Sequence, residues 1–194
     1  MKELAIESYF NSFFSNNKNI KVATARAGNV VGGGDWAPHR IIPDIVRSWK
    51  EGIKVKIRSP KSVRPWQHVL EPLSGYLKLG EELYQNKIIN GEAFNFGPKE
   101  SNKYTVHDLL INLSNYLEGL EWKFENKLNN KKEMKLLTLD SKKASILLNW
   151  NAKLSFDHTI NLTANWYKKF YGKLAKEELY KITVDQINEY ESIK

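Results

Sequence analysis

The sequence contains no cysteine in its 194 residues, and this absence excludes disulfide bridges and thiolate-bound metal sites. The four histidines are scattered and lack the short spacing of zinc ligands; they are His39, His68, His107 and His158. A mean hydropathy of -0.53, with no long apolar run, argues against a membrane span. The N-terminal residues include no cleavable apolar stretch, so we expect a soluble, cytoplasmic protein.

The glycine patterns that mark nucleotide-binding loops are also missing. Neither G-x-G-x-x-G nor G-x-x-x-x-G-K-[ST] occurs, so no dinucleotide site can be identified from the residues. The three consecutive glycines at 32–34 are not spaced as a phosphate loop, Asp35 would repel a phosphate, and Pro38 delays the next helix. We interpret the triplet as a turn after a strand, an edge where α/β proteins bind ligands. Asn29 is the residue there with the longest hydrogen-bonding reach.

Basic residues clearly outnumber acidic residues in the sequence. Thirty lysines and arginines against 22 acidic residues give a net charge of +8. A nucleic-acid binder is one interpretation, because cations neutralise phosphates. The lysines, however, are spread along the chain without a basic stripe that contains aromatic residues. We therefore expect no nucleic-acid partner, and a phosphate-bearing ligand would need only two or three of these cations.

Apolar spacing predicts helices that alternate with strands, which is typical of an α/β fold. The expected helices lie at 3–14, 39–51, the later part of 64–85, 105–120, 140–150, 155–171 and 175–194. The expected strands lie at 20–25, 53–60, the start of 64–85, 91–98, 121–126 and 135–140. Thr105, Asp140 and Ser155 are the expected N-caps, and Gly52 is the expected stop of the second helix.

Four segments resemble a known family in their order and spacing. They are RAGNVVGGGDWAPHRIIPDIVRSW, IRSPKSVRPWQHVLEPLSGYLKLGEELY, FNFGP and KLLTLDSKKASILLNW. Together they resemble the CDP-glucose 4,6-dehydratase family of the extended short-chain dehydrogenase/reductase superfamily. The resemblance runs from about Glu3 to at least Tyr171.

The resemblance implies the C-terminal half of such an enzyme. Residues 1–35 would end a Rossmann-type NAD-binding domain, 36–171 would form mainly the small α/β substrate-binding domain with interspersed Rossmann elements, and 172–194 would be a helical tail. In the family, the N-terminal half carries the glycine fingerprint and the catalytic Tyr-x-x-x-Lys. Glu3 and Leu4 resemble the segment just after that lysine, so the resemblance implies that this chain lacks the catalytic pair and is inactive alone.

The family reaction converts CDP-glucose to CDP-4-keto-6-deoxyglucose and water, with NAD used catalytically. The resemblance implies that NAD is bound mainly by the other half, that CDP-glucose or a similar sugar nucleotide is the partner of this half, and that the full-length enzyme is a homo-oligomer. No catalytic residue and no metal ligand is expected among these 194 residues. This half would bind and orient the substrate.

Two positions are the strongest candidates for substrate binding. Asn29 matches the family asparagine at a strand end and could donate to a diphosphate oxygen, and a loop-capping amide is the less favoured alternative. Arg64 matches the family arginine before an aromatic residue, and its planar guanidinium suits a diphosphate. Val30, beside Asn29, would place its backbone near the nicotinamide and is the one expected cofactor contact; a plain core residue is the alternative.

The remaining candidates depend more heavily on the resemblance. Arg40 would face the nucleotide from a helix start, with a solvated surface arginine as an equal alternative. Asn95 would contact ribose or base, with a strand-turn amide as the alternative. Glu133 and Lys135 lie where relatives hold a nucleotide-contacting segment. The Asp35–Trp36 pair marks the subfamily, with a role in substrate contact, loop order or plain structure left open.

Other functions remain as alternatives. The chain could belong to another NAD-dependent sugar-nucleotide epimerase or dehydratase. It could also be a non-catalytic remnant that still binds a nucleotide.

Overall fold

The structure is a computed structural model that describes residues 2–17, 19–85, 88–99, 103–125, 135–172 and 174–193. Its helices are α1 (Lys2–Tyr9, continued by a π-helical turn at Phe10–Phe14), α2 (Ile41–Glu51), α3 (Leu70–Gln85), α4 (Val106–Ser114), α5 (Lys142–Leu148), α6 (Phe156–Tyr171) and α7 (Lys176–Ser192). Its strands are β1 (Thr24–Ala27), β2 (Asn29–Val31), β3 (Val55–Ile57), β4 (Trp66–His68), β5 (Ala93–Phe96) and β6 (Trp122–Phe124).

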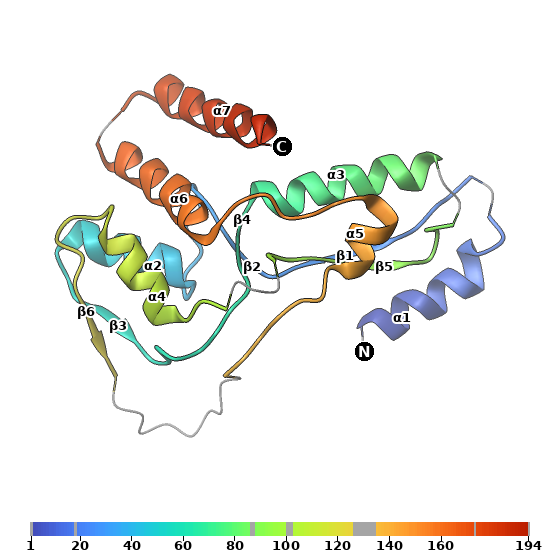
Figure 1. Cartoon of the computed structure of the whole chain (residues 1–194), viewed down its shortest axis with the longest axis horizontal. Coiled ribbons are helices and arrows are strands. Elements are labelled where there is room, and N and C mark those ends of the chain that lie inside the picture. The colour runs from blue at the N-terminus through green and yellow to red at the C-terminus, as the bar shows by residue number, and fades with distance from the viewer. Residues whose placement is uncertain are drawn as a thin grey trace.

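The strands form three parallel pairs, β1 with β5, β2 with β4 and β3 with β6. Partners are never consecutive in the chain, and parallel pairing requires crossover connections of this kind. The expected α/β fold is thereby confirmed. Only Gly28 separates β1 from β2, so the first two pairs follow one another along the chain path. Figure 1 shows this path running from the β1–β5 pair into the β2–β4 pair.

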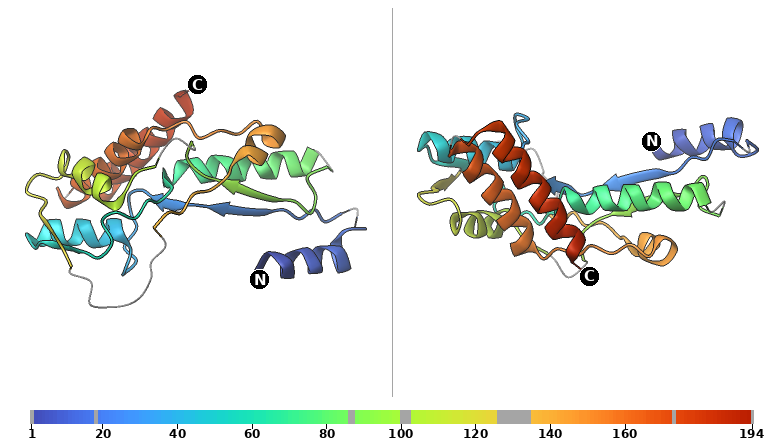
Figure 2. Two further views of the ribbon diagram at one scale, coloured as in Figure 1. Left: turned by 60° about the horizontal axis from the view of Figure 1, so that its bottom comes forward. Right: turned by 90° about the horizontal axis from the view of Figure 1, so that it is seen from above.

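One buried apolar cluster belongs to the β1–β5 pair. Phe94 and Phe96 of β5 are completely buried in it, together with Leu79 of α3 and Leu148 of α5. α3 and α1 lie on opposite sides of this pair (Figure 2). The α1 segment packs only loosely on its side, since Leu4, Tyr9 and Phe13 are each more than half exposed.

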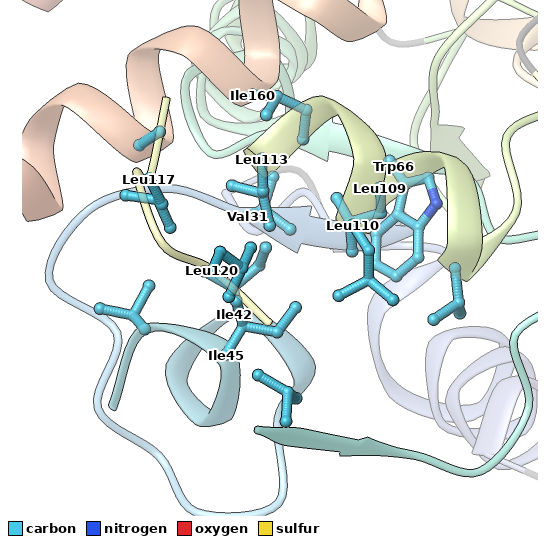
Figure 3. Close-up of a cluster of buried hydrophobic side chains, with 14 of the residues drawn as sticks. Val31, Ile42, Ile45, Trp66, Leu109, Leu110, Leu113, Leu117, Leu120 and Ile160 are labelled. Carbon is cyan, nitrogen blue, oxygen red and sulfur yellow. The ribbon is translucent and has the colours of Figure 1, made fainter. Parts of the chain in front are cut away.

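A second, larger cluster lies around β2, β3 and β4. Val31 of β2 and Trp66 of β4 pack there against Ile45 of α2, Leu110 of α4 and Ile160 of α6 (Figure 3). The alternating burial of β3, with Val55 and Ile57 buried and Lys56 exposed, gives that strand one core face and one open face. The second cluster thus fixes β2, β3 and β4 relative to one another.

The C-terminal segment is helical, as expected, and it packs on α6. The side-chain amide of Gln186 donates to the Leu162 carbonyl (2.8 Å), and Tyr190 is buried beside Leu162. The Tyr190 hydroxyl lies 2.9 Å from the Glu71 carboxylate, so α7 also contacts the start of α3. This tail is therefore attached at two places.

Most of the expected helix ends are confirmed. Thr105 forms a capping box with Asp108, and the Ser155 hydroxyl accepts from the His158 amide (3.1 Å). Gly52 ends α2 in the left-handed region with φ 67°, as glycine does at helix C-termini. The cap of α5 is displaced by one residue: Ser141 holds the N-cap position, while the Asp140 carboxylate accepts from the Lys142 amide.

Two strand predictions were inaccurate. The strand expected at 20–25 begins only at Thr24, because its partner begins at Ala93 and pairs with it in register. The prediction of a strand at 135–140 is wrong, since the only β pairing there among the described residues is an isolated bridge between Leu136 and Val63. Leu136 is 52 % exposed, so this segment has no buried face that would favour a longer ladder.

Candidate functional site

A cleft of about 630 Å³ opens between the β2–β4 pair, the start of α2 and β3. A volume of this size is typical of sites that hold a nucleotide-sized ligand. Its lining comes from four segments: residues 28–32 and Asp35, residues 39–44, residues 55–59, and Arg64 with Trp66 and Val106. The cleft therefore runs along the whole of β2 and β3, and it begins at Gly28, directly after β1 ends.

Four of the seven predicted site residues line this cleft: Asn29, Val30, Arg40 and Arg64. Asn29 pairs in register with Trp66, two residues after Arg64, so β2 and β4 bring the two strongest candidates to one edge. The Arg64 guanidinium also donates to the Val63 carbonyl (2.8 Å), which fixes part of its orientation.

The other three predicted residues are placed differently. Asn95 lies on β5 and does not line the cleft; its amide nitrogen donates to the Asp140 carbonyl (3.0 Å), while its Oδ1 is buried without a partner among the described residues. Lys135 is not among the lining residues either. Glu133 lies outside the described residues.

Arginine is concentrated at the cleft. The sequence has only five arginines and 25 lysines, yet three arginines line the cleft, Arg40, Arg58 and Arg64, against one lysine, Lys56. Arginine presents a planar fork of donors that binds paired acceptors, which a lysine ammonium cannot match. The sequence reasoning missed Arg58, although the alternation in IKVKIRSP places residues 56 and 58 on the open face of the strand.

Asp35 connects the cleft to the helical layer. Its carboxylate accepts from the Ala37 amide (3.0 Å) and lies 3.4 Å from the Arg40 guanidinium, which is a long, exposed ion pair. Its backbone carbonyl accepts from the Tyr167 hydroxyl of α6 (2.8 Å). Burial, reinforced by the nearby Asp35 charge, raises the pKa of Tyr167 to about 12, so this hydroxyl stays a donor at neutral pH.

The glycine triplet and Trp36 also contact α6. A Cβ at Gly33 would lie 2.1 Å from the indole ring of Trp166, and Gly34 has φ 80°, in the left-handed region. The Trp36 ring lies 5.3 Å from Tyr167 and 4.8 Å from Phe170, measured between ring centroids. The segment GGGDW therefore orders the loop against α6, which supports the structural alternative for the Asp35–Trp36 pair.

β4 contributes two buried polar side chains behind the cleft. Gln67 donates from its amide nitrogen to the Phe96 carbonyl (2.8 Å), which links the β2–β4 pair to β5. His68 is 2 % exposed, and its Nε2 has no partner among the described residues. Burial, with a smaller effect of His158, lowers the pKa of His68 to about 4, so the ring is neutral at pH 7.

One Tyr-x-x-x-Lys spacing does occur, at Tyr190 and Lys194, and the contacts of Tyr190 show whether it could be the catalytic pair that the resemblance places elsewhere. Lys194 lies outside the described residues. Tyr190 contacts Ser74 (2.8 Å) and the Glu71 carboxylate (2.9 Å), away from the cleft. Burial, with the Glu71 charge, raises the pKa of Tyr190, which opposes the ionisation that a tyrosinate base needs. Tyr190 is therefore part of a structural network.

Within the described ranges, no three or more histidine, aspartate or glutamate side chains are grouped as a metal site would require. No helix in the part of the chain that the structure describes has the length and apolar content needed to cross a bilayer.

The sequence is similar to that of one known enzyme. No protein-family model matches the chain. The chain is 36% identical over 197 residues to the CDP-glucose 4,6-dehydratase of Salmonella typhimurium, an alignment that covers 98% of this chain and 53% of that enzyme. The chain thus spans about half the length of the curated relative it matches.

Solved structures share the fold at lower identity. A UDP-glucuronic acid 4-epimerase from Bacillus cereus, in complex with UDP-glucuronic acid and NAD, has a TM-score of 0.71 at 20% identity, covering 87% of this chain and 50% of that one. A dTDP-glucose 4,6-dehydratase from Bacillus anthracis, in complex with NAD, has a TM-score of 0.67 at 20% identity, covering 91% and 52%. The chain is therefore similar in sequence to the Salmonella CDP-glucose 4,6-dehydratase, and it shares its fold with half of these NAD-bound sugar-nucleotide epimerase and dehydratase structures.

Proposed function

We propose that this chain supplies the sugar-nucleotide-binding part of a CDP-glucose 4,6-dehydratase. The observation that carries the proposal is the cleft that gathers Asn29 at the start of β2, Arg64 just before β4 and Arg40 at the start of α2. The similarity to the Salmonella enzyme along 98% of the chain supports the choice of CDP-glucose as substrate. Two arginines and an amide can neutralise and orient a diphosphate.

Each cleft residue has a distinct share in this proposal. Arg64 places its guanidinium fork against the diphosphate, helped by its bond to the Val63 carbonyl and by the fixed backbone of Pro65. Asn29 donates its amide from the neighbouring strand. Arg40, whose ion pair with Asp35 is long and 66% exposed on the arginine side, can exchange that partner for a phosphate oxygen.

When bound, NAD would supply the hydride-transfer chemistry of the family reaction, in which C4 of the glucose is oxidised and C6 is reduced. The sequence has no glycine-spaced phosphate loop, and we propose that NAD is bound mainly by the other half of the enzyme. Val30, which lines the cleft, is the position we propose for a nicotinamide contact. We assign no chemical step to this chain, and propose that its share is to hold C4 of the sugar in a reactive orientation.

The two apolar clusters follow the proposed domain division except at β2, which lies within residues 1–35 but contributes Val31 to the cluster around β2, β3 and β4. The cluster at β1–β5 would belong to the Rossmann-type part, residues 1–35, and to the elements interspersed in 36–171, including α3 and α5. The cluster around β2, β3 and β4 would belong to the substrate-binding part. Asn95, Glu133 and Lys135 stay predictions, as do cytoplasmic location and homo-oligomeric assembly of the full-length enzyme.

The test of the proposal is ligand-dependent stability of the 194-residue chain. A ligand that binds only the folded state raises the melting temperature. We expect CDP-glucose and CDP to raise it, and dTDP-, UDP- and GDP-glucose to raise it less. A stronger effect of another nucleotide would favour the alternative epimerase or dehydratase, and no effect of any nucleotide would refute the proposal. We also expect no dehydration of CDP-glucose by this chain with added NAD.

A further inference from the structure

Arg58 follows β3 directly and lies on the open side of that strand. Val55 and Ile57 are 4% exposed and face the apolar cluster, whereas Arg58 is exposed and lines the cleft. The buried side chains on either side of Lys56 fix the strand, so the backbone that carries Arg58 is held by the core. Arg58 is thus a flexible side chain on a rigid strand end.

Arg58 differs from the other arginines because its side chain has no partner among the residues that the structure describes. Arg26, Arg40 and Arg47 form ion pairs with acidic residues, and Arg64 binds the Val63 carbonyl. Within the described ranges, no hydrogen bond or ion pair involves the Arg58 side chain. Its five donors face a cleft where a bound ligand can use them.

The cleft has two sides, built by different strand pairs. Asn29 and Arg64 come from the β2–β4 pair, whereas Arg58 follows the β3–β6 pair. Figure 1 shows β3 and β6 to the left of β2 and β4. A diphosphate held by Asn29 and Arg64 leaves the Arg58 side of the cleft to another part of the same nucleotide, and the base is the part that offers paired acceptors.

We infer that Arg58 recognises the base of the bound nucleotide and selects cytosine over uracil or thymine. The inference rests on the proposed function. Cytosine presents two adjacent acceptors, O2 and N3, that match the two parallel donors of a guanidinium. Uracil and thymine carry a hydrogen on N3, so this N–H donor would face an N–H donor of the guanidinium. The acceptors that remain, O2 and O4, lie on opposite sides of N3 and do not form an adjacent pair.

The experiment measures binding of CDP, UDP and pyrophosphate to the full 194-residue chain by calorimetry. The variants are Arg58→Gln, which removes the charge and the fork, and Arg58→Lys, which keeps the charge alone. Lys54→Gln is the matched control, since Lys54 precedes the same strand, pairs with Glu121 (2.8 Å) and does not line the cleft. GDP is included because guanine O6 and N7 also form an acceptor pair.

We expect the unmodified chain to bind CDP at least roughly tenfold more tightly than UDP, the size expected of one bidentate base contact. Arg58→Gln and Arg58→Lys should both reduce that preference to about twofold or less, while pyrophosphate affinity changes by less than about twofold. Lys54→Gln should leave all affinities unchanged.

Three results would overturn the inference while leaving the proposed function intact. The first is a preference for CDP over UDP that survives in Arg58→Gln. The second is an equal loss of affinity for CDP, UDP and pyrophosphate in that variant, which would make Arg58 a phosphate ligand. The third is tighter binding of GDP than of CDP by the unmodified chain. If the unmodified chain binds no nucleotide and no pyrophosphate, the inference and the proposed function both fail.

Discussion

Gly33 lies directly against the indole ring of Trp166, so close that a methyl group on Gly33 would be 2.1 Å from ring atoms. We expect Gly33→Ala to destabilise the chain by about 2 kcal/mol, because α6 or the loop must move to relieve the overlap. Urea unfolding followed by tryptophan fluorescence measures the change.

Gly80→Ala is the matched control for this prediction. Gly80 lies inside α3, and a Cβ there would meet nothing within 4 Å. Alanine stabilises a helix interior by roughly 0.5–1 kcal/mol relative to glycine, so this variant should be at least as stable as the unmodified chain. Equal stability losses in the two variants would show that the indole contact is not the cause.

The hydroxyl of Tyr167 supports the same loop from α6. Tyr167→Phe removes the hydrogen bond to the Asp35 carbonyl and keeps the ring contact with Trp36. We expect a loss of about 1 kcal/mol in the free energy of unfolding, typical of one hydrogen bond. An unchanged free energy would mean that water replaces the hydroxyl without cost.

His68 makes stability depend on pH. Its pKa is lowered to about 4 in the folded chain, chiefly by burial, so below about pH 6.5 the unfolded state takes up a proton that the folded state does not. This contribution is present above pH 6.5 and is lost as the pH falls toward 4. Between pH 7 and pH 5 the loss should be about 2 kcal/mol. In His68→Phe this part of the loss should disappear, as urea unfolding at both pH values would reveal.

Arg64 is expected to act through its fork and its charge together. Arg64→Gln should weaken CDP and pyrophosphate binding by about tenfold or more, and Arg64→Lys should recover only part of that loss. Calorimetry with both ligands provides the measurement. Full recovery by lysine would reduce the role of Arg64 to that of a point charge.

Local features of the fold could be predicted from the sequence because they depend on neighbours in the chain. The Thr105 cap, the Gly52 stop and the helices around them follow from spacing within one turn. The contact of Gly33 with Trp166 joins residues far apart in the chain, and no spacing rule reports it. The triplet was rightly predicted as a turn, but its packing partner could not be known.

The site shows the same division. Asn29 and Arg64 were predicted from a resemblance, and parallel pairing then placed them at one edge. The alternation of apolar and charged residues in its strand could have predicted that Arg58 is exposed. Only the fold shows that the exposed face of β3 lines the cleft. The Tyr190–Lys194 spacing is the opposite case: the pattern is present, and burial against Glu71 gives Tyr190 another role.

Asp35 couples the cleft to α6, because it contacts residues of both. Its carboxylate holds Arg40 beside the cleft, while its backbone carbonyl holds Tyr167 of α6. An anion that draws Arg40 away leaves Asp35 with its bonds to the Ala37 amide and Tyr167 alone. Amide hydrogen exchange in α6 should therefore respond to nucleotide binding, although α6 contributes no lining residue to the cleft.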